Sequence, residues 1–167
     1  VSVLFTDVAN STAIFERIDP EEVHQIMDGC FRILMDEIHR YEGTVNQFLG
    51  DGVMAIFGAP IAHEDHAQRA CHAALGIMRA MKGYCEAVER KHKIPFEIRI
   101  GLNSGPVVVG SIGNDLRMDY TADGDTSNLA SRMESNARPG TILISPNTYK
   151  IVGKLFKIKS LGNITVK

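Results

Sequence analysis

A predicted β-hairpin is the feature that most limits how this chain can fold. Residues 44–49 and 53–57 are short segments rich in apolar and β-branched side chains, and only Gly50-Asp51-Gly52 separates them. Asp-Gly is a favoured pair in the tight turns that join antiparallel strands. Because segments with helical periodicity lie on both sides of this hairpin, the chain must combine an antiparallel sheet with helices.

Two long helices are predicted to flank the hairpin. Asp19-Pro20-Glu21-Glu22 supplies an N-cap, a proline at the first helical position and two acids at the positive end of the helix dipole. Apolar side chains then recur at helical spacing as far as Tyr41, and we expect Gly43 to end this helix. A second helix is expected over residues 64–91, with its apolar side chains on one face.

The remaining segments predict additional strands and shorter helices. Alternating or apolar runs predict strands at 1–7, at 98–102, from 107 onward, and twice at the end of the chain. Further helices are expected over 126–137 and from Ser145-Pro146. This mixture suggests an α+β fold with a ferredoxin-like core, in which helices pack on a mostly antiparallel sheet.

Length and charge limit the class of protein. The chain has 167 residues, enough for one domain with a real core. Its 18 basic and 20 acidic residues argue against a nucleic-acid partner, which would favour a basic patch. Because the sequence shows neither a membrane span nor a signal peptide, and starts and stops in strand-like segments, we expect residues 1–167 to be one cytoplasmic domain of a longer chain.

Two aspartates form the first candidate site. Asp7 lies at the end of a predicted strand and precedes small polar residues that open a helix, so its carboxylate can hold a metal beside amides that hold phosphate. Asp51 lies at the tip of the hairpin. Each aspartate alone also suits a simple capping or turn role, but two carboxylates on adjacent strands can share a pair of Mg²⁺ ions.

Asn128 and Arg132 form the second candidate site. They are four residues apart on a predicted helix and therefore share one face. A guanidinium with an amide suits the charge that builds up on a phosphorane-like transition state and its leaving group. As an isolated pair, they equally suit an exposed polar couple on the surface.

Together, four segments resemble the class III adenylyl and guanylyl cyclase family in order and spacing: LFTDVANST, FLGDGVMAIFG, IRIGLNSGPVVVG and YTADGDTSNLASRM. The resemblance covers essentially the whole chain. It implies an adenylate cyclase catalytic domain of the bacterial homodimeric type, which converts ATP to 3′,5′-cyclic AMP and pyrophosphate. It also implies regulatory domains elsewhere in the full-length protein, which could be anchored to a membrane.

The resemblance implies a role for each candidate residue. Asp7, Asp51 and the Val8 carbonyl would bind two Mg²⁺ or Mn²⁺ ions per site, while Asn128 orients the ribose and Arg132 stabilises the α-phosphate. The residues that would hold the triphosphate are Asn10, Ser11, Thr12, Arg117 and Lys167. In this family one partner supplies the metals and the other supplies the Asn/Arg pair, so a homodimer would have two sites at its interface.

The residues that would recognise the base depart from the family pattern. Adenylyl cyclases typically carry Lys and then Asp or Thr at these positions, and guanylyl cyclases carry Glu and then Cys or a similar small residue. This chain has Gln47 and Thr121. A Gln amide and a Thr hydroxyl both donate and accept hydrogen bonds, so the pair can read adenine or tolerate guanine. Thr121 matches an adenylyl subset and favours ATP. Asp123 stands where a hydrophobic residue usually lies beside the base.

Three other interpretations compete with this one. A catalytically weak, cyclase-like dimerising regulator is kept open by Gln47 and Asp123. A diguanylate cyclase would carry a GG[DE]EF hairpin, which Gly50-Asp51-Gly52-Val53 does not match. The histidines of His63-Glu64-Asp65-His66 have ligand-like spacing, but they stand at a helix start where capping or solvated groups are more common than metal ligands.

Overall fold

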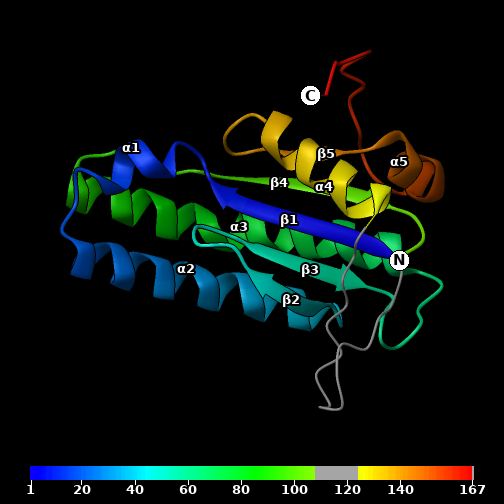
Figure 1. Cartoon of the computed structure of the whole chain (residues 1–167), viewed down its shortest axis with the longest axis horizontal. Helices are drawn as coiled ribbons and strands as arrows, with labels where there is room; N and C mark the ends of the chain where they lie inside the picture. Colours follow the sequence, from blue (N-terminus) through cyan, green and yellow to red (C-terminus); the bar gives the residue numbers. More distant parts are fainter. Residues whose placement is uncertain (108–123, 167) are drawn as a thin grey trace.

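The computed structural model describes residues 1–107 and 124–166 of the chain, and Figure 1 shows their arrangement. The elements in chain order are β1 (Ser2–Val8), α1 (Ser11–Phe15), α2 (Pro20–Arg40), β2 (Thr44–Phe48), β3 (Val53–Phe57), α3 (His66–His92), β4 (Ile98–Ser104), α4 (Asp125–Asn136), β5 (Ile142–Ile144), α5 (Pro146–Val152) and a 3₁₀ turn (Gly153–Leu155).

The strands form one sheet in the order β2-β3-β1-β4-β5. The first four strands pair in antiparallel fashion, and β5 runs parallel to β4. β1 lies at the centre, with β3 on one side and β4 on the other. The prediction of an α+β fold with a mostly antiparallel sheet is therefore confirmed.

The two faces of the sheet carry different helices. Leu4 of β1 belongs to the main core, which includes buried side chains of α2 and α3, whereas its neighbour Val3 packs with Ala130 of α4. Successive side chains of a strand point to opposite faces, so α4 covers the face opposite α2 and α3. Figure 1 shows this arrangement, with α4 in yellow across β1 and β4.

The start of α2 follows the prediction, but its end does not. Asp19 accepts a hydrogen bond from the Glu21 amide at 3.4 Å, and Pro20 is the first helical residue. The helix ends at Arg40, and Glu42 takes the left-handed conformation, with φ of 61°. Gly43 is needed instead because a Cβ there would come within 2.6 Å of the Phe57 ring.

Of two other predictions about elements, one agrees with the structure and one is wrong. The helix predicted over roughly residues 64–91 forms over His66–His92, so its start lies two residues later. The two strands predicted at the end of the chain are absent over residues 156–166, whose residues are mostly exposed. An extended segment counts as a strand only when a neighbour pairs with its backbone, and a pattern of alternating side chains does not supply that neighbour.

The strand predicted to start at Val107 is only partly described. Val107 itself is not in a strand, and residues 108–109 lie outside the described ranges. Within residues 1–107 and 124–166, no helix combines the length and apolar character that a membrane crossing requires.

Candidate functional site

The hairpin tip is packed against the end of β1. A Cβ on Gly52 would overlap the Thr6 carbonyl oxygen, so only glycine allows the two backbones to approach this closely. The amide of Val53 donates a hydrogen bond to Thr6 Oγ1 at 3.1 Å. Asp51 in the turn is thereby held next to Asp7, the residue that follows Thr6.

Both carboxylates line one open cleft of about 340 Å³. Its walls are Asp7, Val8, Asn10, Ser11, Thr12, Ala13, Asp51 and Arg99. The cleft thus brings together six residues that the sequence predicted for metal or phosphate binding, from segments far apart in the chain. Their roles in binding stay predictions.

A sharp turn of the backbone presents the start of α1 to this cleft. Asn10 precedes the helix in a left-handed conformation, with φ of 56°, which asparagine tolerates better than most residues. The Ser11 hydroxyl donates a hydrogen bond to Asp51 Oδ2 at 2.7 Å, which ties α1 to the hairpin tip. The first amides of a helix lack partners within the helix, so they are available to an anion in the cleft.

Arg99 is a cleft residue that sequence reasoning missed. It lies opposite Asp7 in the β1–β4 ladder. Its Nε donates to Asp7 Oδ1 at 2.8 Å and its Nη2 to Asp7 Oδ2 at 2.7 Å. This two-pronged contact raises the pKa of the guanidinium, so the cleft holds a permanent positive charge beside its two carboxylates.

Glu134 of α4 is a second missed residue, on the other side of Arg99. Its side chain is nearly buried, and its Oε1 lies 3.4 Å from Arg99 Nε without a hydrogen-bond partner in the part of the chain that the structure describes. Burial, followed by the neighbouring Asp7 carboxylate, raises the pKa of Glu134 to about 8. The guanidinium therefore neutralises Asp7, while Glu134 favours its protonated form at neutral pH.

The donors in the cleft fit a magnesium-type ion better than a zinc-type ion. Asp7 and Asp51 offer carboxylate oxygens, and Val8 lines the cleft beside them. Mg²⁺ is usually held by one or two carboxylates and takes its other ligands from water and substrate phosphates. Across residues 1–107 and 124–166 there is no group of three or more His, Cys, Asp or Glu that would hold an ion by themselves.

The histidines that open α3 have other partners. His63 Nε2 lies 3.1 Å from Glu42 Oε2, and His66 Nδ1 is hydrogen-bonded to the Ser2 hydroxyl at 2.8 Å. Because the two side chains contact different elements, the structure favours the interpretation of this motif as part of the packing at the helix start.

Asn128 and Arg132 do not line the cleft. Both side chains are exposed on α4, and neither is among the residues that surround Asp7 and Asp51. A single chain therefore leaves the two predicted halves of the site apart. Four further predicted site residues lie outside the described residues: Arg117, Thr121, Asp123 and Lys167.

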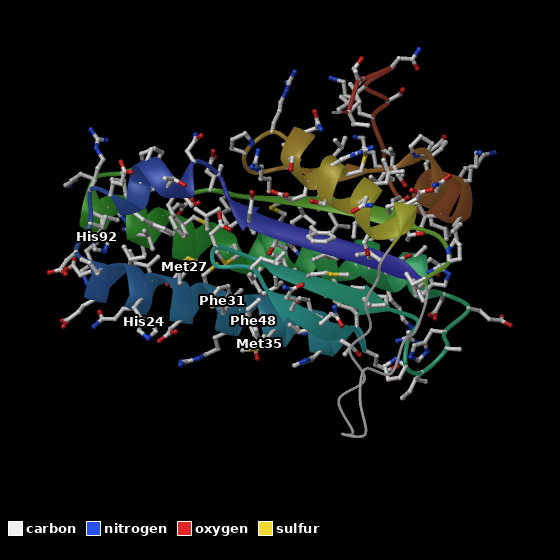
Figure 2. The ribbon with its side chains drawn as sticks, in the orientation of Figure 1. His24, Met27, Phe31, Met35, Phe48 and His92 are labelled. Carbon is white, nitrogen blue, oxygen red and sulfur yellow. The ribbon has the colours of Figure 1, made fainter. Side chains whose placement is uncertain are left out.

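Gln47 is also outside the cleft, on β2 at the edge of the sheet. It is exposed and follows an irregularity in the ladder between Val45 and Gln47. Its neighbour Phe48 is 52% exposed and contacts Phe31 of α2 edge to face, with ring centroids 5.2 Å apart. Figure 2 labels both residues, Phe31 on α2 and Phe48 on the neighbouring hairpin.

Comparison with known proteins gives a consistent family. The model of the adenylate and guanylate cyclase catalytic domain matches residues 1–167. Adenylate cyclase 1 of Rhizobium meliloti is 35% identical over 169 residues, which cover 100% of this chain and 25% of that protein. The rat guanylate cyclase soluble subunit beta-2 is 31% identical over 167 residues, covering 99% of this chain and 24% of that subunit. The chain thus spans about a quarter of these relatives.

Solved structures of both adenylyl and guanylate cyclases share the fold of this chain. The adenylyl cyclase CyaB from P. aeruginosa matches with a TM-score of 0.90 and 34% identity, covering 99% of this chain and 86% of that one. The guanylate cyclase domain of RhGC from Catenaria anguillulae, solved in complex with GTP, matches with a TM-score of 0.88 and 34% identity, covering 99% and 88%.

Proposed function

Because the chain belongs to the family of adenylate and guanylate cyclase catalytic domains, we propose that it forms 3′,5′-cyclic AMP and pyrophosphate from ATP. The family relation gives nucleotidyl cyclase chemistry, and the choice of ATP is the finer part of the proposal. One observation carries the proposed cyclase reaction: Asp7, Asp51 and the start of α1 line the same cleft. That cleft joins carboxylates for metal ions with amides for phosphate.

The reaction needs little covalent chemistry from the protein. The ribose 3′-hydroxyl gives its proton to solvent as its oxygen bonds to the α-phosphorus. The bond between the α-phosphorus and the oxygen that bridges to the β-phosphorus breaks, and pyrophosphate leaves with that oxygen. Two Mg²⁺ or Mn²⁺ ions held by Asp7, Asp51 and the Val8 carbonyl would activate the 3′-hydroxyl and screen phosphate charge. The amides of residues 10–12 bind the triphosphate, and Arg99 offers it a guanidinium at the same cleft.

The positions of Asn128 and Arg132 support a shared site. Both side chains are exposed and outside the cleft of their own chain. In a dimer with twofold symmetry, each α4 faces the partner's cleft, so Asn128 orients the ribose and Arg132 stabilises the α-phosphate there. The homodimer then has two identical sites, each built from two chains.

The preference for ATP rests on the base-recognition pair. Gln47 donates and accepts hydrogen bonds, and Thr121 matches an adenylyl pattern, so adenine is favoured while guanine is tolerated. A guanylyl or dual-specificity cyclase is the second candidate, because the Catenaria anguillulae domain with 34% identity was solved with GTP.

The first experiment tests the metal site. The purified domain is incubated with Mn²⁺ and ATP or GTP, and the cyclic product is identified by mass spectrometry. Asp51→Ala should abolish product formation while the fold persists, because a half-buried turn carboxylate adds little to the core. Asp36→Ala, at an exposed aspartate of α2, is the matched control and should remain active. Substantial Mn²⁺-dependent activity of Asp51→Ala would overturn the assignment.

The second experiment tests the shared site. Asp7→Ala and Arg132→Ala homodimers should each be inactive, because every site loses one essential group. After subunit exchange, about half the dimers are mixed, and each mixed dimer has one intact site, so about a quarter of wild-type activity should return. If exchange is verified and the mixture stays inactive, the two-chain site is wrong for this protein.

A further inference from the structure

One face of β4 and the residues just after it form the surface on which α4 packs, called here the α4 seat (residues 101 and 103–106). Gly101 has no Cβ, and one added there would overlap the Ala130 carbonyl and the Glu134 amide of α4. Two residues further along, Asn103 donates a hydrogen bond from Nδ2 to the Thr126 carbonyl at 2.9 Å. The helix therefore lies on backbone at Gly101 and is fixed by a polar contact at Asn103.

The amide of Asn103 is held from both ends. Its side chain is 1% exposed. Its Oδ1 accepts a hydrogen bond from the Ser145 hydroxyl at 2.6 Å and another from Asn147 Nδ2 at 3.3 Å. Because the oxygen is occupied by donors from α5 and its N-cap, the NH₂ group must point toward α4. The orientation of this amide is thus determined by its partners.

The first turn of α4 has a second contact with the same segment. The Thr126 hydroxyl donates to the Pro106 carbonyl at 2.6 Å. Gly105 lies beneath this hydroxyl, and a Cβ there would come within 2.6 Å of Thr126 Oγ1. Both the carbonyl and the side chain of Thr126 are therefore held by residues 103–106, which makes Thr126 the point where the start of the helix is set.

The polar contacts continue into the centre of the sheet. Ser104 Oγ is hydrogen-bonded to Thr148 Oγ1 of α5 at 2.9 Å and to Ser2 Oγ of β1 at 2.6 Å. All three side chains are buried. Buried polar networks are costly unless every member is paired, and when paired they specify one arrangement more strongly than apolar packing does.

We propose that Asn103 is a positioning residue that sets the first turn of α4, and through it the alignment of Asn128 and Arg132 with the partner's cleft. The inference rests on the proposed function, in which Asn128 and Arg132 of α4 complete the partner's site. Asn128 lies two residues beyond Thr126 and Arg132 about one turn further, so a shift of the first turn moves both groups. Neither Asp7 nor Asp51 contacts Asn103. The nearest link from α4 to Asp7 runs through Glu134 and Arg99, about two turns beyond Thr126.

Kinetics separate positioning from a general loss of folding. Asn103→Ala removes the donor, and Asn103→Asp keeps the acceptor but turns an oxygen toward the Thr126 carbonyl. We expect kcat to fall on the order of tenfold to a hundredfold, as small misplacements of reacting groups do. The nucleotide KM and the Mn²⁺ affinity should change by less than about threefold. An unchanged kcat per folded molecule, or an equal loss of Mn²⁺ affinity, would overturn the proposal.

Thr126 provides a variant that does not touch the amide. Thr126→Val keeps the shape of the side chain and loses the hydrogen bond to Pro106, so kcat should fall in the same way. Thr126→Ser keeps the hydroxyl and is the matched control, with kcat close to wild type. If Thr126→Val and Thr126→Ser are equally active, the α4 seat does not position the helix.

Mixed dimers provide the decisive test. In an exchanged mixture of Asn103→Ala and Asp51→Ala, one site combines the intact carboxylates of the first chain with the intact α4 of the second, so activity should recover. In a mixture of Asn103→Ala and Arg132→Ala, each site receives one defective α4, so no recovery is expected. Recovery in the second mixture, or none in the first, would reject Asn103 as part of the α4 half.

A reference mixture separates this inference from the function it rests on. Asp51→Ala with Arg132→Ala should recover activity if each site is shared by two chains. Failure of this reference mixture after verified exchange overturns the shared site, and the role of Asn103 falls with it. Recovery there, combined with the wrong pattern for Asn103→Ala, overturns the role of Asn103 alone.

Discussion

Arg99 occupies both carboxylate oxygens of Asp7, at 2.8 and 2.7 Å, from the opposite position of the β1–β4 ladder. A metal ion that binds Asp7 must compete with this guanidinium for the same oxygens and is repelled by its charge. Arg99 therefore weakens the binding of a metal ion to Asp7 when the cleft holds no phosphate. Once a triphosphate enters, the guanidinium can bind phosphate oxygens in addition to Asp7.

Replacing Arg99 should separate these two effects. Arg99→Met is expected to bind Mn²⁺ several-fold more tightly without nucleotide, because the competing cation is gone, and to lose kcat/KM because the triphosphate loses a charged partner. Calorimetric titration with Mn²⁺ and steady-state kinetics measure the two quantities. Arg138→Met, at an exposed arginine, should change neither. Weaker Mn²⁺ binding by Arg99→Met would show that the guanidinium supports the ion.

Glu134 should make stability depend on pH. The pKa of its carboxyl is raised from an ordinary 4.5 to about 8, chiefly by burial, so the folded state holds a proton that the unfolded chain has released. The resulting stabilisation is complete below pH 4.5 and is lost as the pH rises through about 8. Glu134→Gln cannot ionise, so between about pH 5 and pH 9 its stability should decline less than that of wild type.

Urea unfolding at several pH values tests the assignment of this dependence to Glu134. Glu64→Gln, at an exposed glutamate, should follow the wild-type curve. Parallel curves for wild type and Glu134→Gln would mean that the buried carboxyl is not the source of the dependence.

Gly52 should be intolerant of any side chain. Gly52→Ala forces a methyl group against the Thr6 carbonyl, so we expect a loss of about 1–3 kcal/mol in the free energy of unfolding, with weaker Mn²⁺ binding because Asp51 moves away from Asp7. Gly83→Ala, on the exposed face of α3, is the matched control. No described residue lies within 4 Å of the added Cβ, and the change should stabilise the protein by roughly 0.5–1 kcal/mol. Equal stabilities of the two variants in urea would contradict the close approach at Gly52.

Gln47 should govern the choice between ATP and GTP. Gln47→Lys introduces a pure donor, which is expected to favour ATP by about 1–3 kcal/mol in the ratio of kcat/KM values. Gln25→Lys makes the same chemical change at an exposed position of α2 and controls for the added charge. A ratio that stays the same in Gln47→Lys would mean that this side chain does not face the base.

The local positions of Asp7 and Asp51 could be anticipated from sequence because both lie next to recognisable local signals. Asp7 lies one residue before the end of β1, and Asp51 lies in the short turn between β2 and β3, where Gly50 has a positive φ. Local patterns of this kind are set by neighbouring residues and can be read without the rest of the fold.

Arg99 and Glu134 could not be found in this way. The alternation of Ile98, Arg99 and Ile100 predicts that Arg99 points away from the main core, but its contact with Asp7 depends on the β1–β4 register. Glu134 reads as an ordinary polar helix position, and only the close approach of α4 at Gly101 buries it. Both contacts arise from tertiary packing, which no single segment encodes.

The alternation of β4 also limits which changes in chain length this domain can accept. Ile100 and Leu102 point into the main core, while Arg99, Gly101 and Asn103 meet β1 and α4 on the other face. Inserting or deleting one residue in this strand would exchange the two sets beyond the change, so that an asparagine enters the core and a leucine lies under the helix. A substitution in β4 changes one side chain on one face of the sheet. A change of one residue in length moves every later side chain of the strand to the opposite face.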